Sequence, residues 1–478
     1  MKNTLLIEKA YFNGAFITAD KTFEIINPST QKPVGVLPDL SVKDVKKYIK
    51  AAHEAWLTWR STAVGERSRI LRRLFDLINE RRDELAEIMT LESGKPIKES
   101  QTEVDYANSF VEWFSEEAKR AYGETIPSTA GNNRMQTIKQ GVGVVAAITP
   151  WNFPLAMITR KVAPALAAGC SVVLKPASQT PFSAIAFAQL AEEAGVPKGV
   201  LNVITSKDSR GLGEEMATNP LVRKISFTGS TAVGKTLMSQ AASTIKRISL
   251  ELGGNAPFIV FDDADIDKAV EGAIAGKFRN TGQTCVSINR FYVQDDVYDE
   301  FAKKLTAAVK KLEVGDGLKK TTQVGPLINP EGLEKVIHHV KDATEKGATI
   351  ATGGKALKGN FFEPTVLLDV PHNSIIAEEE TFGPICALFR FKTEKEVIEL
   401  ASETPFGLAS YFYSDNVTRC FRVAEQLEAG MVGINAGLIS NAAAPFGGVK
   451  ESGLGREGSK YGLDEYIEVK YMCFGYQI

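Results

Sequence analysis

The chain has 478 residues, too many for one ordinary hydrophobic core, so two or three substructures are expected. A hydrophobic content of 44% and a charged content of 24% are typical of a soluble globular protein. The formal charge of -2 gives no sign of the concentrated basic surface that binds nucleic acid or an anionic membrane. The longest apolar runs are too short to cross a bilayer, and the N-terminus does not resemble a secretory signal. We therefore expect a cytoplasmic protein with no nucleic-acid or membrane partner.

The cysteine and histidine patterns argue against disulfides and metals. The five cysteines stand singly without a CxxC pair, and an odd number does not suit a disulfide framework. The four histidines show no metal-ligand spacing. We therefore predict no metal site and interpret most cysteines as small buried hydrophobic residues. The cysteines are Cys170, Cys285, Cys386, Cys420 and Cys473.

The first part of the chain has helical patterns followed by a strand–helix alternation. Ser41 and Asp44 form a helix-capping pattern, and a long amphipathic helix is predicted over Glu66–Leu91, ending before Gly94. From about Gly141, apolar runs suited to strands buried on both faces alternate with loops and helices. This alternation predicts a doubly wound α/β domain. The runs are VGVVAAIT, SVVLK, LNVIT, RKISFTG and PFIVFDD.

A second strand–helix series extends from Asp265 to about Gly447, with a helix over 296–312 and strands near Phe361–Leu368 and Ser410–Ser414. A polar stretch near Thr125–Gln140 has strand-like ends, and the final YIEVKYMCF alternates like an exposed strand. Exposed edge strands often pair with a neighbouring subunit. We therefore expect an oligomer.

One glycine-rich motif leaves two functions open. GSTAVGKT, at Gly229–Thr236, matches the P-loop pattern between a predicted strand and a helix expected to begin near Lys235. PFIVFDD resembles the strand whose terminal Asp holds magnesium in P-loop NTPases, so an NTPase is a rival interpretation. In either case, a glycine loop before a helix N-terminus forms an anion site for a phosphate. A second match, GLGREG, follows no apolar strand and is interpreted as chance.

Three polar residues near strand ends suit covalent catalysis. Cys285, in GQTC just before a strand, stands where a thiol can be ionised and exposed, although a lone cysteine is more often structural. Glu251 ends the strand RISLEL beside a diglycine, which suits a base that swings in to activate water; the alternative is a surface ion pair. Asn152 follows VGVVAAIT and offers an amide to a developing oxyanion, or else forms a turn.

Seven motifs, in this order and spacing, resemble the aldehyde dehydrogenase superfamily: TPWNFP, KPAS, FTGSTAVG, LELGGN, GQTC, EETFGP and PFGG. They span nearly the whole chain and together outweigh the P-loop match. The resemblance implies a doubly wound Rossmann-like cofactor domain, an α/β catalytic domain and a small β oligomerisation element, in homodimers or homotetramers. The expected bounds are 1–121 and 142–253 for the dinucleotide-binding domain, 254–451 for the catalytic domain, and 122–141 with 466–478 for the oligomerisation strands.

The resemblance also implies a mechanism. The Cys285 thiolate attacks the aldehyde, the Asn152 amide and the Cys285 backbone N–H hold the oxyanion, and Glu251 activates the water that hydrolyses a thioester. A non-catalytic protein on the same scaffold is disfavoured because all three residues are present. The GSTAVG loop receives the pyrophosphate of NAD(P) rather than ATP, and Trp151 packs near the cofactor or serves the core. Further positions that match cofactor-binding residues of the family are Lys175, Ser178, Gly229, Ser230, Gly234, Glu380 and Phe382.

The same resemblance bears on the cofactor and the substrate. NAD-preferring members often carry Glu where Ser178 stands; Ser178 removes the repulsion of a 2′-phosphate, so NADP⁺ is favoured over NAD⁺. Arg160, Arg279 and Ser440 resemble positions that bind the distal carboxylate in succinate-semialdehyde dehydrogenases. Two guanidiniums also suit a carboxylate on chemical grounds, although structural pairing is the ordinary role of one arginine. We expect succinate semialdehyde as substrate, with glutarate semialdehyde as the nearest alternative, since one methylene discriminates by only about 10–200-fold.

Overall fold

The computed structural model describes residues 3–129 and 131–475, so the parts of the expected domains at 1–2, 130 and 476–478 lie outside the described residues. The largest sheet has eight strands, of which β11, β10, β7, β8 and β9 run parallel in that order. Short antiparallel strands β19, β1 and β2 complete its two edges. In sheet order the strands are β19 (Gly453–Leu454), β11 (Arg247–Glu251), β10 (Val222–Thr228), β7 (Val144–Ile148), β8 (Ser171–Lys175), β9 (Leu201–Val203), β1 (Ala10–Phe12) and β2 (Ala15–Ile17).

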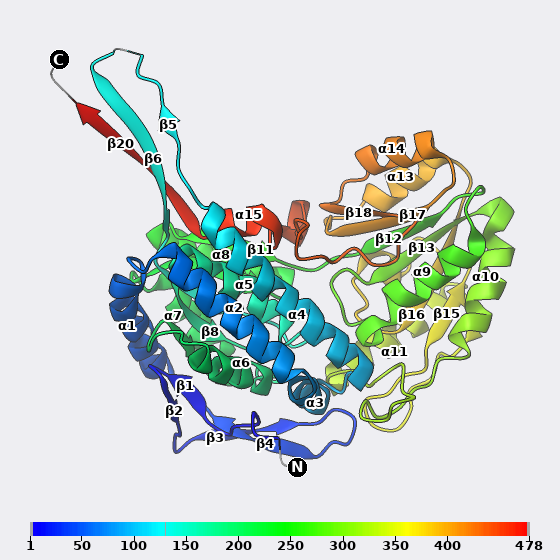
Figure 1. The fold of residues 1–478 in the computed structure, drawn as a ribbon. Helices are drawn as coiled ribbons and strands as arrows, with labels where there is room; N and C mark the ends of the chain where they lie inside the picture. The colour runs from blue at the N-terminus through cyan, green and yellow to red at the C-terminus, as the bar shows by residue number, and fades with distance from the viewer. Residues whose placement is uncertain (1–2, 130, 476–478) are drawn as a thin grey trace.

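Helices cover both faces of this sheet (Figure 1), with α1, α7 and α8 on one face and α2, α4, α5 and α6 on the other. The central strands β7 and β8 are buried on both faces, with Val145 and Val172 at 0% exposure. The doubly wound α/β architecture predicted from the sequence is confirmed. The helices are α1 (Val42–Trp59), α2 (Val64–Glu80), α3 (Arg82–Ser93), α4 (Ile97–Glu117), α5 (Ala156–Ala168), α6 (Phe182–Glu193), α7 (Ser209–Thr218) and α8 (Thr231–Ala241).

The helix predicted over Glu66–Leu91 is in fact two helices, α2 and α3. They meet at Arg81, whose backbone (φ -107°, ψ 19°) is not helical. Apolar residues continue on the buried side through both helices, so the helical periodicity does not reveal a break of one residue. The ends were predicted correctly: α3 stops at Gly94 with a left-handed φ of 74°, and α1 begins with the Ser41–Asp44 capping box.

A second sheet of seven strands has the order β14-β15-β16-β13-β12-β17-β18, with every neighbouring pair parallel except β14–β15. The run PFIVF was expected to continue the first series, but it forms β12 at the centre of this second sheet. An apolar run shows that a strand is buried, and does not show which sheet buries it. The strands are β12 (Ala256–Val260), β13 (Ile288–Gln294), β14 (Thr349–Thr352), β15 (Thr365–Leu368), β16 (Ile385–Phe391), β17 (Ala409–Tyr413) and β18 (Met431–Ile434). The helices are α9 (Ile266–Phe278), α10 (Asp295–Val309), α11 (Pro330–Glu345), α12 (Ile375–Glu378), α13 (Glu394–Ser402) and α14 (Val417–Gln426).

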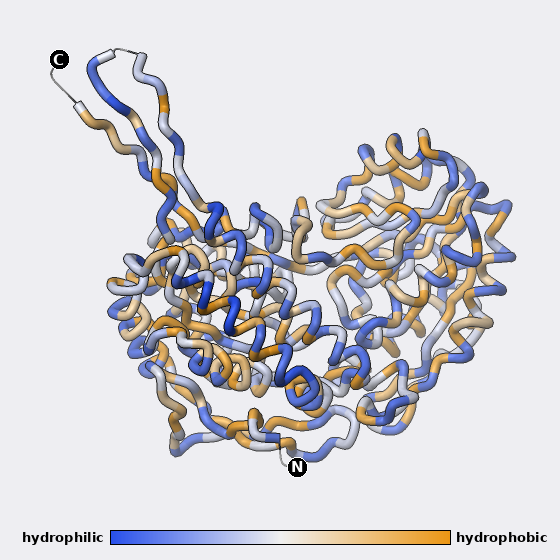
Figure 2. Tube along the Cα trace, in the orientation of Figure 1, coloured by the Kyte–Doolittle hydropathy of each residue, from blue (hydrophilic) through white to orange (hydrophobic). Residues whose placement is uncertain are grey.

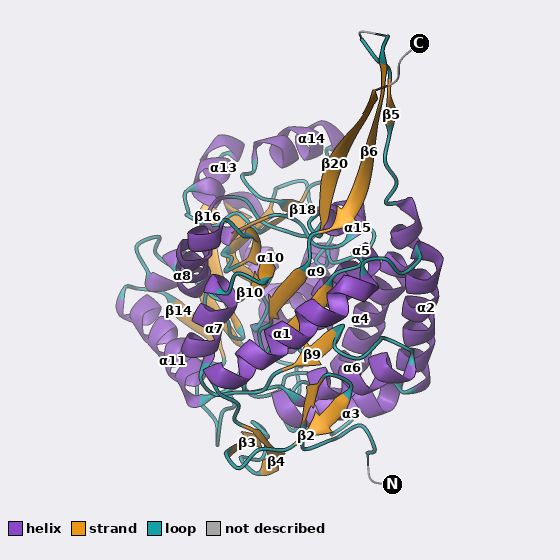
Figure 3. Cartoon of the chain, turned by 90° about the vertical axis from the view of Figure 1, so that its left-hand side faces the viewer, coloured by secondary structure: helices purple, strands orange, loops and turns teal. Residues whose placement is uncertain are grey.

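A three-stranded arm of β20 (Ile467–Gly475), β6 (Asn133–Gly141) and β5 (Thr125–Ile126) projects from the body in both views (Figures 1 and 3). Hydrophobic and hydrophilic residues both occur along it (Figure 2). At the base of the arm, α15 (Ser459–Asp464) packs on α4 and α5. The strand β20 lies at the edge of the arm and exposes Val469, Tyr471 and Phe474. The stretch near Thr125–Gln140 and the C-terminal stretch, which were both predicted to contain strands, therefore pair in one sheet. The strand β20 is a free edge of this sheet. A separate two-stranded sheet is formed by β3 (Thr22–Ile26) and β4 (Pro33–Pro38).

No helix among the described residues is both long and apolar enough to cross a membrane.

Candidate active site

Cys285 lies in the loop between α9 and β13, and the backbone of this loop is unusual. Asn280, Thr281 and Gly282 follow one another with left-handed φ values of 51°, 61° and 75°. This conformation is unfavourable for residues that carry a side chain, so it needs support from its surroundings. Part of that support is a hydrogen bond of 2.6 Å, in which the Asn280 N–H donates to the Glu99 carboxylate. The loop that presents Cys285 is therefore held from outside.

The half-buried Cys285 lines two cavities, and the larger has a volume of about 240 Å³. This cavity lies beyond the carboxyl ends of β7, β10 and β11, where doubly wound sheets bind their ligands. Trp151 and Phe382 pack edge to face in its wall, with ring centroids 5.5 Å apart. Besides Cys285, the cavity brings together the predicted residues Trp151, Asn152, Gly229, Ser230, Glu380 and Phe382.

Glu380 is the acidic group of this cavity. One of its carboxylate oxygens accepts a hydrogen bond of 3.1 Å from the Gly254 N–H, and burial raises its pKa to about 7. A carboxylate at this place can accept hydrogen bonds from the hydroxyls of a bound sugar. Lys335 also lines the cavity and donates to the Glu380 carbonyl oxygen at 2.6 Å. The cavity thus offers both an acceptor and a cation to a dinucleotide.

The glycine-rich motif does not have the geometry of a P-loop. The helix α8 begins at Thr231, not near Lys235 as expected, so the last glycine and the lysine of the motif lie inside the helix. Lys235 is exposed and pairs with Glu451 at 2.8 Å. Gly234 faces Leu252, which a Cβ atom would approach to 2.5 Å, so it serves helix packing rather than the cavity. The anion site that remains is the start of α8, where Ser230 caps the helix at the cavity wall.

The strand that resembled a magnesium-binding strand lies elsewhere. It belongs to the second sheet, and the aspartates that follow it, Asp262 and Asp263, pair with Arg419 at 3.0 and 2.6 Å. Among the described residues, no group of three or more His, Cys, Asp and Glu side chains is arranged to hold a metal ion. The geometry therefore gives the NTPase interpretation no support.

The second cavity is much smaller, is also lined by Cys285, and contains both predicted arginines. Arg160 is buried, with its guanidinium 3.8 Å from the centroid of the Phe446 ring. Arg279 lies over the Phe153 ring at 5.1 Å. The cavity is lined by Tyr106, Phe153, Met157, Arg160, Arg279, Thr284, Cys285, Val286, Ser440 and Phe446. The structure thus places two guanidiniums and the Ser440 hydroxyl in an aromatic pocket that opens on the thiol.

Arg160 has a structural partner as well as a place in the pocket. Its Nε lies 2.7 Å from a carboxylate oxygen of Glu457, and Lys161 contacts the other oxygen at 2.5 Å. One terminal nitrogen of Arg160 is buried without a hydrogen-bond partner among the described residues. A buried unsatisfied donor is costly, so this nitrogen favours an acceptor from a ligand. Both interpretations of Arg160, structural pairing and carboxylate binding, are therefore compatible with its geometry.

Asn152 is buried, and its amide is partly engaged. Its Nδ2 donates to the Gln283 carbonyl oxygen at 3.1 Å. A primary amide has two hydrogens to donate, so one remains for a ligand in the cavity that Asn152 and Cys285 both line. This hydrogen bond joins Asn152, which follows a strand of the first sheet, to the Cys285 loop, which precedes a strand of the second.

The Cys285 thiol is less ionisable than its sequence position suggested. Burial raises its pKa to about 12, and the negative charge of Glu380 acts in the same direction. The positive charges of Arg160 and Arg279 oppose this effect without cancelling it. The surroundings of Cys285 thus favour the neutral thiol in the free protein, whereas the sequence position suggested an exposed thiol that can be ionised.

Glu251 is a buried carboxyl at the end of β11, 3% exposed, and it does not line either cavity. Burial raises its pKa well above the usual value, and the negative charge of Glu457 adds to this rise. Its Oε2 has no hydrogen-bond partner among the described residues. The adjacent Gly254 is packed against the Cys285 carbonyl oxygen, which a Cβ atom would approach to 2.4 Å. The diglycine thus permits close packing beside the Cys285 loop.

Lys175 and Ser178 lie away from the Cys285 cavities, near the carboxyl end of β8. Ser178 lines a separate surface cavity together with the exposed Lys207. Lys175 is buried, donates to Ser209 at 3.0 Å, and has its pKa lowered to about 8 by burial. Lys207 was not singled out from the sequence, although it follows β9 beside the end of β8, at the edge where doubly wound sheets bind ligands.

The chain is similar to known proteins over nearly its whole length. Residues 16–472 match the model of the aldehyde dehydrogenase family. The chain is 58% identical over 471 residues to a glutarate-semialdehyde dehydrogenase of Pseudomonas putida, covering 98% of each chain. It is 57% identical over 477 residues to a succinate-semialdehyde dehydrogenase [NADP(+)] of Escherichia coli, covering 99% of each. A crystal structure of a succinate-semialdehyde dehydrogenase from Burkholderia pseudomallei superposes with a TM-score of 0.98 at 56% identity, covering 100% of both chains.

The chain belongs to the aldehyde dehydrogenase family. The resemblance read from the seven motifs is confirmed, and with it the similarity to succinate-semialdehyde dehydrogenases.

Proposed function

We propose that this protein oxidises succinate semialdehyde to succinate with NADP⁺ or NAD⁺. The observation that carries the proposal is the small aromatic cavity in which Arg160, Arg279 and Ser440 face the Cys285 thiol. An aldehyde at Cys285 that carries a carboxylate at its far end can place that carboxylate between the two guanidiniums. The names of the relatives in Escherichia coli and Burkholderia pseudomallei support the same substrate.

In the proposed mechanism, each residue has one task. The Cys285 thiol loses its proton to solvent, and the resulting thiolate sulfur forms the bond to the aldehyde carbon. The Asn152 amide and the Cys285 backbone N–H stabilise the negative oxygen that the carbonyl becomes. NADP⁺ or NAD⁺, when bound, accepts the hydride. Glu251 then takes a proton from the water that cleaves the thioester. Its Oε2, which has no hydrogen-bond partner in the described protein, supports this task because it can accept a proton from a water molecule.

The cofactor is proposed to occupy the cavity at the carboxyl edge of the first sheet. This cavity suits a dinucleotide because it contains a helix N-terminus, an acceptor in Glu380 and an aromatic wall of Trp151 and Phe382. The loop residues Gly229 and Ser230 are proposed to meet the pyrophosphate. Gly234 is proposed to act indirectly, through the packing of α8.

Removing one arginine tests the substrate proposal. Arg279→Met is expected to lower kcat/KM for succinate semialdehyde by about 10–100-fold, because a charge-assisted hydrogen bond is lost. Butanal has the same number of carbons and no carboxylate, so its kcat/KM should change less than about 3-fold. Arg279 is the better choice than Arg160, which also balances Glu457. An equal loss for both aldehydes would contradict carboxylate recognition.

Glutarate semialdehyde is the second candidate substrate, favoured by the relative from Pseudomonas putida. The additional methylene changes binding by only about 1–3 kcal/mol in a pocket of this kind. Comparing kcat/KM for the two semialdehydes in the wild-type protein decides between them.

We propose NADP⁺ as the favoured cofactor, because Ser178 presents no negative charge and Lys207 offers a cation in a cavity whose one acidic lining residue is Glu24. Ser178→Glu is expected to lower kcat/KM for NADP⁺ by about 10–100-fold and to spare NAD⁺, since a carboxylate repels a 2′-phosphate. Ser178→Gln, which is similar in size and uncharged, serves as the control. Unchanged use of NADP⁺ by Ser178→Glu would place the adenosine ribose elsewhere.

The domain assignment is also proposed: dinucleotide binding by 1–121 and 142–253, catalysis by 254–451, and oligomerisation by 122–141 and 466–478. The two large sheets support the first two parts, although β19 at Gly453–Leu454 returns to the first sheet. The projecting arm with its free, partly apolar edge at β20 supports a homodimer or homotetramer. We also propose a cytoplasmic location, as expected from the composition and charge of the sequence.

A further inference from the structure

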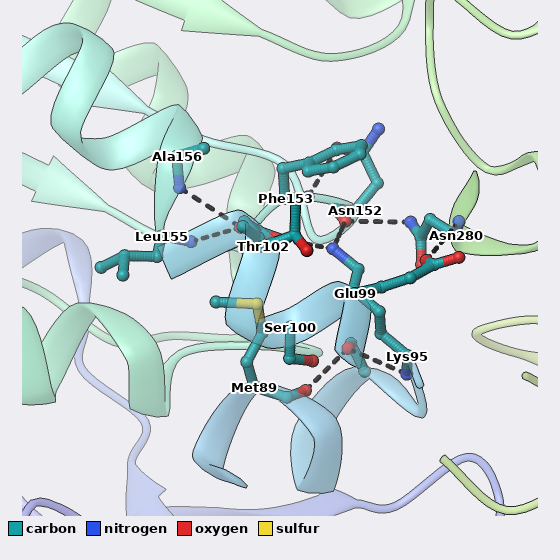
Figure 4. A network of polar contacts seen from close by, with 12 residues as sticks. Met89, Lys95, Glu99, Ser100, Thr102, Asn152, Phe153, Leu155, Ala156 and Asn280 are labelled. Carbon is teal, nitrogen blue, oxygen red and sulfur yellow. Dashed lines mark hydrogen bonds and ion pairs between the residues drawn. The ribbon is translucent and has the colours of Figure 1, made fainter. Parts of the chain in front are cut away.

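The backbone at Asn152 is held by side chains from two distant parts of the chain (Figure 4). Its carbonyl oxygen accepts hydrogen bonds from Lys95 Nζ and from Asn280 Nδ2, each at 2.9 Å. Its side chain donates to the Gln283 carbonyl oxygen and accepts from the Phe153 N–H, each at 3.1 Å. The orientation of Asn152 is therefore set by the protein before any ligand binds.

Lys95 reaches Asn152 from a fully buried position. Lys95 and Glu103 form an ion pair in which each side chain is 1% exposed. Glu103 also accepts hydrogen bonds from the backbone N–H groups of Leu155 at 3.0 Å and Ala156 at 3.3 Å, where α5 begins. A carboxylate is favourable there because it meets free N–H groups and the positive end of the helix dipole. Lys95 and Glu103 thus hold the segment from Asn152 to the start of α5 as one unit.

The loop that carries Cys285 is held by the same helix. Glu99 and Glu103 are four residues apart on α4 and so lie on one helix face. Glu99 accepts the hydrogen bond from the Asn280 N–H, and the Asn280 side chain in turn reaches the Asn152 carbonyl. One face of α4 therefore aligns a segment of the first sheet with a loop of the second.

We propose that Lys95 and Glu99 are positioning residues of the oxyanion site: they fix the Asn152 amide relative to the Cys285 backbone N–H. Neither side chain lines a cavity at Cys285, so neither touches the substrate directly. The inference rests on the proposed function, since it assumes that an oxyanion forms between these two donors. A displacement of such donors by about 1 Å costs on the order of 10²-fold in rate.

Lys95→Met keeps a long side chain in the buried site and removes the donor to Asn152. We expect kcat to fall by about 10–100-fold, with KM for aldehyde and cofactor within about 2-fold of wild type. The deciding measurement is a double-mutant cycle with Asn152→Ala. If Lys95 acts through Asn152, Lys95→Met lowers kcat by less than about 2-fold when it is added to the Asn152→Ala variant. Equal fold losses in both backgrounds would overturn the inference.

A control variant separates positioning from general destabilisation. Ser100 neighbours Glu99 on α4 and forms a buried hydrogen bond of 2.8 Å with Thr90 that does not reach Asn152. Ser100→Ala is expected to lower Tm and leave kcat unchanged. A loss of kcat in Ser100→Ala that equals the loss in Lys95→Met would show a merely structural effect and overturn the proposal.

Glu99 provides a second test that does not depend on folding of the Lys95 variant. Glu99→Gln keeps a carbonyl acceptor for the Asn280 N–H, whereas Glu99→Ala removes it. We expect Glu99→Gln to retain most of the kcat and Glu99→Ala to lose about 10-fold. Equal losses in the two variants would remove Glu99 from the positioning network.

A crystal structure of Lys95→Met gives a readout that needs no activity. The Asn152 amide should leave its present position, with loss of the 3.1 Å contact to Gln283. If Asn152 does not move in this variant, the positioning role of Lys95 is overturned and the proposed function is not affected. Wild-type protein that reduces neither cofactor with any semialdehyde would instead overturn the proposed function.

Discussion

Replacing Cys285 with alanine is expected to abolish turnover, with a loss in kcat on the order of 10⁶-fold, as for nucleophile removal in other covalent enzymes. Both cavities remain formed, because the side chain is a small part of their walls. Cofactor binding, measured by fluorescence titration, should therefore stay within about 3-fold of wild type. Absorbance at 340 nm with succinate semialdehyde and NADP⁺ measures the loss.

Cys420→Ser is the matched control. Cys420 is a buried thiol on α14, outside both cavities, so this variant should turn over normally. Substantial cofactor reduction by Cys285→Ala would assign the nucleophile to another group.

The reactivity of Cys285 should also depend on pH. With its pKa raised to about 12 by burial, the free protein holds the neutral thiol at pH 7, and the thiolate fraction grows about tenfold per pH unit. The rate of alkylation by iodoacetamide should therefore rise from pH 7 to pH 10 without a plateau. A plateau near pH 8 would mean that Arg160 and Arg279 outweigh the burial of the sulfur.

Glu251→Gln is expected to stop the second half of the reaction and spare the first. The variant still forms the bond from Cys285 to the substrate, but it lacks the base for water. Rapid mixing should show a burst of about one reduced cofactor per subunit, followed by steady turnover about 10²–10⁴-fold slower than wild type. Mass spectrometry of the quenched protein should find the acyl group on Cys285.

Burial raises the pKa of Glu251, so its neutral form is favoured and the base is more abundant at higher pH. In the wild type, thioester hydrolysis should accelerate as pH rises through this pKa, and Glu251→Gln should remove that rise. Glu92→Gln is the control, because Glu92 is another buried carboxyl with a raised pKa that binds the start of α6 instead of the site. A burst in Glu92→Gln, or none in Glu251→Gln, would contradict this role.

Much of the site was accessible from the sequence, because its residues follow strands. Asn152 comes after β7, the glycine loop after β10 and Glu251 at the end of β11, and parallel neighbours bring their carboxyl ends together. The order of strands along the chain therefore predicts a common edge. The arginines were found through the resemblance, since a guanidinium on a helix has no local pattern that marks it for a ligand.

Other features depend on packing between distant segments and have no local signal. The sequence around Lys235 matches the P-loop pattern. The residue at which α8 begins, however, determines which backbone N–H groups are free to bind an anion. The ionisation of Cys285 depends on burial and on Glu380, almost a hundred positions away. The Lys95–Glu103 pair joins a buried turn to a helix, and neither residue belongs to a recognisable motif.

The ion pairs around the small cavity have a consequence for electroneutrality. Two buried cations, Arg160 and Lys161, share the single carboxylate of Glu457, and Arg279 adds further positive charge to the cavity wall. The raised pKa of Glu251 favours its uncharged form, so it compensates little of this excess. A semialdehyde anion brings the missing negative charge and makes the occupied pocket closer to electrically neutral than the empty one. We therefore propose that selection against uncharged aldehydes begins in the free protein, whose pocket carries this excess of positive charge until an anion enters.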